Sequence, residues 1–91
     1  MMTESHLNLM HSLITARGQV RGVTYCNGTI RINHRYGKRF VSGSVSGSSR
    51  DAYKAALLKL GAGVGLPAVG VECLVKRTYS NFLAHYGLSV K

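Results

Sequence analysis

The stretch QVRGVTYCNGTIRINHRYGKRFVSGSVSGSSRDAYKAALLKLG, residues 19–61, decides the fold of this 91-residue chain. It contains three short runs typical of β-strands, at roughly 19–25, 29–35 and 39–45, followed by a helical segment at about 49–60. Asn27-Gly28 between the first two runs is the strongest short hairpin signal, because both residues accept a positive φ. Gly37 can serve the next turn. We therefore predict a three-stranded antiparallel sheet packed on a helix.

The second predicted strand has a clear alternation of apolar and polar side chains. Ile30 and Ile32 fall on one face, and Arg31, Asn33 and Arg35 fall on the other, since successive strand residues point to opposite sides. The isoleucines are expected to face the core. The faces of the third predicted strand remain ambiguous, because its apolar and polar residues do not alternate cleanly.

The helical segment that follows is expected to begin with Ser48-x-x-Asp51 as a capping box and to stop at Gly61. Its small alanines allow a helix to lie close to the sheet. From this face and from the strand alternation we predict a core that includes Leu9, Ile14, Val23, Ile30, Ile32, Ala52, Ala56 and Leu57.

Two further segments flank this core. Residues 4–17 have an apolar stripe at helical spacing, and residues 72–86 favour a second helix. The alternative for the latter is a strand over 69–76 followed by a helix from Thr78. Residues 61–70 are rich in glycine and are expected to form a loop. The whole chain, residues 1–91, is then one α+β domain with the sheet and its helix over about 19–61.

The composition indicates an anionic partner. The chain has a formal net charge of +9, from twelve Lys and Arg against three acids, and it has no acid between Glu4 and Asp51. Nucleic acid is the commonest partner of so basic a domain, ahead of an anionic membrane or an acidic protein surface. We assign the candidate nucleic-acid-binding residues to the predicted sheet: Arg21, Tyr25, Arg31, Asn33, Arg35, Lys38 and Arg39.

Several short motifs in this region resemble the AP2/ERF DNA-binding domain: Arg21-Gly22-Val23, Gly28-x-Ile30, Gly37-Lys38-Arg39, Gly43 and the alanine-rich helix. Related sheets occur in phage homing endonucleases and in the arm-binding domains of tyrosine integrases. The resemblance covers about 19–61. It implies a three-stranded antiparallel sheet on one helix, with the sheet in the DNA major groove.

The same resemblance implies roles for particular residues. Arg21 matches the family's first-strand arginine, Arg35 and Arg39 match later contact arginines, and Asn33 stands where the family often has an acid. The chain departs from the family in having no tryptophan, and in having Ser42 before Gly43 in place of leucine. The function that follows is a small duplex-DNA-binding regulator or accessory factor of the phage type.

Two other functions stay open. Helix, three strands and helix is also the order of double-stranded-RNA-binding domains, with Arg50 and Lys54 in the place of their basic helix start. The third possibility is a phage-type adaptor or inhibitor that binds a host protein through its basic surface. The flanking helices are candidates for contacts with a protein partner or for a homodimer.

Catalysis has little support, because three acids and four histidines form no paired constellation in the sequence. We expect no enzyme activity, no cofactor and no metal, since Cys26 and Cys73 lack zinc-site spacing. Both thiols are expected to be reduced and buried. The sequence shows no signal peptide and no membrane span, so we expect a cytoplasmic or nucleoid-associated protein.

Overall fold

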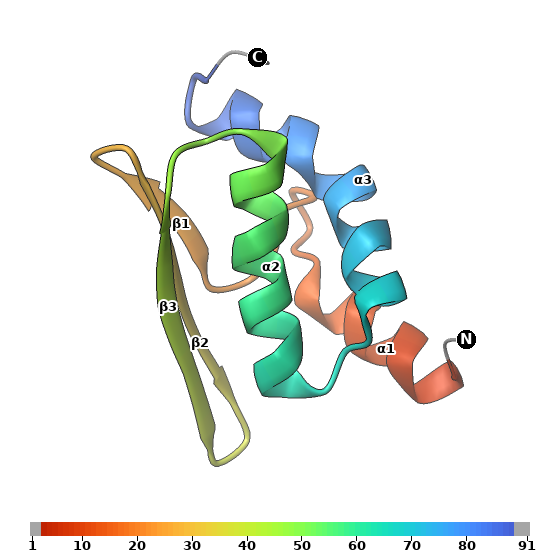
Figure 1. Cartoon of the computed structure of the whole chain (residues 1–91). Helices are drawn as coiled ribbons and strands as arrows, with labels where there is room; N and C mark the ends of the chain where they lie inside the picture. The colour runs from red at the N-terminus through yellow and green to blue at the C-terminus, as the bar shows by residue number, and fades with distance from the viewer. Residues whose placement is uncertain (1–2, 89–91) are drawn as a thin grey trace.

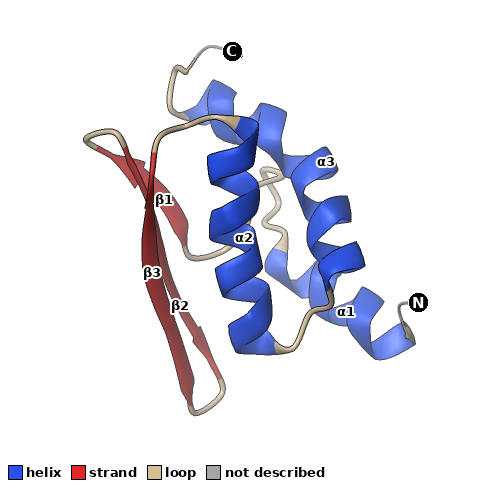
Figure 2. Cartoon of the chain, viewed as in Figure 1, coloured by secondary structure: helices blue, strands red, loops and turns tan. Residues whose placement is uncertain are grey.

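A computed structural model describes residues 3–88. Its elements are α1 (Glu4–Leu13), β1 (Val23–Cys26), β2 (Thr29–Tyr36), β3 (Arg39–Ser46), α2 (Arg50–Val64) and α3 (Ala68–His85). The strands form one layer, and the three helices lie on one side of it (Figure 1). Coloured by element type, the helices and the sheet separate into two layers, with the other face of the sheet left bare (Figure 2). The predicted α+β class, with its three-stranded sheet and flanking helices, is confirmed.

The sheet is antiparallel in the order β1-β2-β3. β1 pairs with β2 from Val23 opposite Ile32 to Cys26 opposite Thr29. The turn between them is the expected one, with positive φ of 51° at Asn27 and 76° at Gly28. Ile30 and Ile32 are 0% and 2% exposed, so the predicted alternation of β2 is correct.

The long helix α2 covers the inner face of the sheet, and its end differs from the prediction. Ser49, one residue later than expected, caps the start by accepting a hydrogen bond from the Ala52 amide. The helix passes Gly61 and ends at Val64, with Gly65 as a left-handed cap. The prediction of a glycine-rich loop over 61–70 was therefore wrong.

The glycines inside α2 are there for close packing. A Cβ at Gly61 would lie 2.8 Å from Cγ2 of Val71 on α3, and a Cβ at Gly63 would overlap the side chain of Val41 on β3. Each glycine therefore lets the helix approach a neighbour that any side chain would push away. The tightness of these contacts explains why glycine is present despite its poor helix propensity.

The other boundaries also shift. α3 begins at Ala68, so the alternative of a strand over 69–76 is wrong. α1 ends at Leu13, four residues before the predicted end, because Ile14 forms an antiparallel bridge with Val20. That bridge occupies the first half of the predicted first strand, and β1 proper begins only at Val23.

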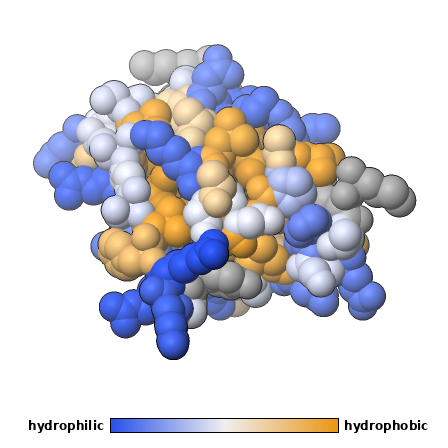
Figure 3. Space-filling model, turned by 60° about the horizontal axis from the view of Figure 1, so that its bottom comes forward, coloured by the Kyte–Doolittle hydropathy of each residue, from blue (hydrophilic) through white to orange (hydrophobic). Residues whose placement is uncertain are grey.

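The flanking helices complete the core. α1 contributes Met10 and Leu13, and α3 contributes a long buried stripe that includes Leu74, Val75 and Phe82. Seen from its lower end, the molecule shows hydrophobic side chains in the middle of the surface, with hydrophilic ones around them (Figure 3). Of the predicted core residues, Val23, Ile30, Ile32, Ala56 and Leu57 are buried, whereas Leu9, Ile14 and Ala52 are half-buried at its margin.

One buried polar pair ties α2 to α3. The hydroxyls of Tyr53 and Thr78 are 2.7 Å apart, and Thr78 Oγ1 donates to the Leu74 carbonyl at 2.6 Å. Because the threonine hydroxyl has a single proton, the Tyr53 hydroxyl must be the donor to Thr78. Tyr53 is only 1% exposed, and burial raises its pKa from 10.0 to about 12, against the smaller lowering effect of this hydrogen bond.

The Gly63–Val41 contact leads to a first prediction. Gly63→Ala should destabilise the fold by about 1–3 kcal/mol through overpacking, although alanine gains about 1 kcal/mol in helix propensity. Adding Val41→Ala should recover part of this stability, which thermal or urea unfolding of the two single variants and the double variant will measure. Stabilisation by Gly63→Ala alone would show that the contact is not tight.

The Tyr53 hydroxyl leads to a second prediction. Because its folded pKa is raised, the native state keeps this proton after the unfolded chain has lost it. The stability that the protonated Tyr53 hydroxyl contributes is therefore fully present below pH 10 and is lost as the pH rises towards about 12. The decrease in stability is on the order of 2–3 kcal/mol. Between pH 8 and 11.5, the free energy of unfolding in urea should decline more steeply for the wild type than for Tyr53→Phe, and parallel declines would contradict the assignment.

Candidate nucleic-acid interface

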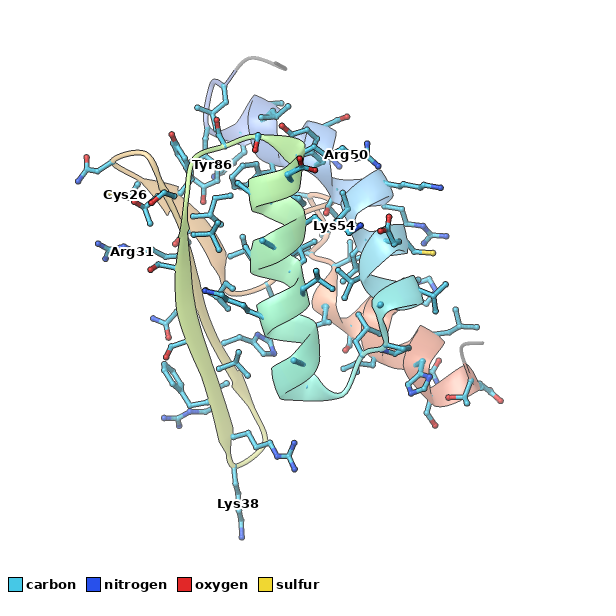
Figure 4. The ribbon with its side chains drawn as sticks, viewed as in Figure 1. Cys26, Arg31, Lys38, Arg50, Lys54 and Tyr86 are labelled. Carbon is cyan, nitrogen blue, oxygen red and sulfur yellow. The ribbon has the colours of Figure 1, made fainter. Side chains whose placement is uncertain are left out.

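The bare face of the sheet carries the central part of the predicted site. Arg31, Asn33 and Arg35 are exposed and occupy alternate positions of β2, opposite in direction to Ile30 and Ile32. Arg31 points away from the helices (Figure 4). The three predicted residues of β2 therefore share one surface, which no other described element covers.

The neighbouring strand β3 completes this outer face with small hydroxyl side chains and one aromatic ring. Across the two strands, Arg31 is opposite Ser44, Asn33 is opposite Ser42, and Arg35 is opposite Phe40. The face is hollowed into an open depression of about 680 Å³, whose lining includes Arg31, Asn33, Phe40 and Ser42. Small side chains on β3 beside long ones on β2 account for this shape.

Two of the predicted residues are not on this face. Arg21 lies in the turn before β1, where its Nε donates to the Ser12 carbonyl at 3.0 Å, so it binds the end of α1. Tyr25 is half-buried on the inner face, and its ring contacts Phe82 and Tyr86 with centroids 6.0 and 5.9 Å away. The alternation along β1 explains this position, because Tyr25 is two residues from the buried Val23.

The remaining two predicted residues lie at the far end of the β2–β3 hairpin. Lys38 is in the turn and extends away from the body of the molecule (Figure 4). Arg39 is exposed and is paired with Tyr36, one position from the Arg35–Phe40 pair. Its side chain therefore starts from the opposite side of the sheet to Arg35. Both residues add charge at the hairpin tip, outside the depression.

Phe40 is the residue that the sequence-based prediction missed. It is 60% exposed, more than the exposed Leu7, Leu58 and Val69. The Gly37-Lys38 turn contained the signal, because a two-residue turn there sets Phe40 opposite Arg35 and hence on the outer face. Cys26 also lies on this face, and Cys73 on α3 is half-buried, so the expectation that both cysteines are buried was wrong.

The acidic side chains all lie on the helices. Glu4 and Asp51 are in the first turns of α1 and α2, and Glu72 is on α3. Glu72 pairs with Lys54 of α2, and its pKa is lowered by the hydrogen bond and charge of that lysine. The strands therefore place no carboxylate among the cations of the outer face. On the helices, by contrast, Lys54 is paired with the carboxylate of Glu72.

Other kinds of site find no support in the part of the chain that the structure describes. Residues 3–88 bring no three His, Cys, Asp or Glu side chains together as ligands for a metal. No helix in the same range has the length and apolar character needed to cross a membrane. Comparison with protein-family models, with curated protein sequences and with solved structures gave no match.

Proposed function

We propose that this protein binds duplex DNA through the outer face of its sheet, as a small regulator or accessory factor. The observation that carries the proposal is the exposed row Arg31, Asn33 and Arg35, on a sheet face that none of the described helices covers and that has no acid on its strands. A sheet of two or three strands is narrow enough to enter a major groove.

The spacing of the row suits that groove. Arg31 and Arg35 are four residues apart on β2, which at a strand's rise puts their backbones about 13 Å apart. That length is close to the roughly 12 Å width of the major groove. We assign the two arginines to phosphates or guanine edges at the ends of the row, and Asn33 between them to an adenine edge.

The wider charge distribution supports the same partner. The chain has a net charge of +9, and Lys38 and Arg39 add positive charge at the hairpin tip. Such a surface attracts phosphates over about a Debye length, roughly 10 Å at 0.1 M salt. The AP2/ERF resemblance points to the same partner. Arg21 lies outside the contact set that we propose, since it is bound to Ser12.

Double-stranded RNA is the second candidate. The order α1, three strands, α2 is the one noted for double-stranded-RNA-binding domains. Those domains use basic residues at the start of the last helix. Here Lys54 is paired with Glu72, so a carboxylate already compensates the charge of one of the two cations at the start of α2, which weakens this candidate.

A mobility-shift assay with duplex DNA, single-stranded DNA and duplex RNA tests the proposal. Arg31→Ala with Arg35→Ala should weaken duplex-DNA binding by about 1–3 kcal/mol per base-reading residue. The slope of log K against log salt should shrink by about 0.9 for each phosphate that the variant no longer neutralises.

The matched control is Arg50→Ala with Arg77→Ala, which removes two exposed arginines from the helices and keeps the net charge of the two double variants equal. Under the proposal this control retains most of its affinity. Equal weakening in the two double variants would contradict the proposal, and a preference for duplex RNA would favour the second candidate. Failure to bind any nucleic acid at low salt would favour a protein partner.

A further inference from the structure

Phe40 has an exposed aromatic ring, which adds nothing to the buried core and so little to the stability of the fold. The side chain is 60% exposed on the outer face of β3, away from the core, and it helps to line the open depression. Its direct neighbour across the strands is Arg35. A solitary exposed apolar residue needs no explanation, but this one lies on β3 beside the row Arg31, Asn33 and Arg35 of the candidate interface.

The ring has polar neighbours suited to the edge of a base. Asn33 and Ser42 are opposite each other on β2 and β3 and line the same depression; Asn33 is the diagonal neighbour of Phe40, and Ser42 is two residues along β3 from it. Diagonal neighbours in a sheet are about 7–8 Å apart. An asparagine amide donates and accepts hydrogen bonds, and a serine hydroxyl does the same. A planar group lying on Phe40 would thus have hydrogen-bonding partners at its edge, with Arg35 directly opposite Phe40 and Arg31 further along β2 for phosphates.

An intact duplex does not offer such a planar group, because the faces of its bases are covered by their neighbours in the stack. Only an unpaired or extruded base presents a free face. Stacking of such a base on an aromatic side chain contributes about 1–3 kcal/mol, whichever base it is.

We propose that the outer face of the sheet takes an unpaired base onto the ring of Phe40. The preferred ligand is then DNA in which a paired segment adjoins an unpaired nucleotide, as at a bulge. This inference rests on the proposed function and narrows it, since the arginines hold the backbone while Phe40 distinguishes unpaired from paired bases. An apolar protein partner is disfavoured by the surrounding uncompensated charge.

The test measures the fluorescence anisotropy of a labelled duplex of about 20 base pairs and of the same duplex with a one-nucleotide bulge. Wild-type protein should bind the bulged duplex about 5- to 150-fold more tightly. Phe40→Leu keeps the apolar character and removes the π face, so it should bring the ratio of the two affinities to about one by weakening the bulged duplex more than the paired duplex. Phe40→Tyr should retain the ratio. A 2-aminopurine at the bulge should change its fluorescence on binding by wild type and much less on binding by Phe40→Leu.

The outcomes separate this inference from the function on which it rests. A wild-type ratio near one, or a ratio that survives Phe40→Leu, overturns the role of Phe40 while duplex binding stands. Equal weakening of both ligands by Phe40→Leu, with an unchanged thermal melting curve, also overturns it and makes Phe40 an ordinary contact. Absence of binding to either ligand overturns both proposals.

Discussion

The close contact of α2 with the inner face of the sheet is the constraint on which the rest of this structure depends. Gly63 against Val41, and Gly61 against Val71, bring the helix near enough to cover β3 on one side and to meet α3 on the other. With all three described helices on that side, the sheet has one buried and one bare face. The strict alternation of β2 then determines the surface chemistry, because burying Ile30 and Ile32 obliges Arg31, Asn33 and Arg35 to face outward.

Features with local causes could be predicted from the sequence. Asn27-Gly28 specified the first hairpin, and the alternation in β2 specified its two faces. The three residues of the candidate site on β2 followed from that alternation alone. The helical character of both flanks was also visible, because an apolar stripe at helical spacing reflects burial of one side wherever the partner lies.

Features that depend on distant contacts could not be predicted. Gly61 and Gly63 are ordinary helix breakers until Val71 and Val41 lie against them, so the sequence alone favoured a loop. Arg21 leaves the sheet because the carbonyl of Ser12, nine residues earlier, accepts its hydrogen bond. Tyr25 and Phe40 are a different case. The face of each residue follows from the alternation along its strand and from the register of the hairpin. Because the prediction weighed charge instead, it included Tyr25, which faces inward, and omitted Phe40, which faces outward.

The molecule thus divides by role, with the helices supplying the core and the bare face of the sheet supplying the proposed contacts. The most direct test is a titration of ¹⁵N-labelled protein with duplex DNA, followed by the chemical shifts of backbone amides and arginine Nε–H groups. We expect the changes to concentrate on β2, β3 and the hairpin turn, including Arg31 Nε and Arg35 Nε, while α1 and α3 stay near their free values. Changes concentrated on the helices, with β2 unaffected, would contradict the assignment of the sheet face as the DNA-binding surface.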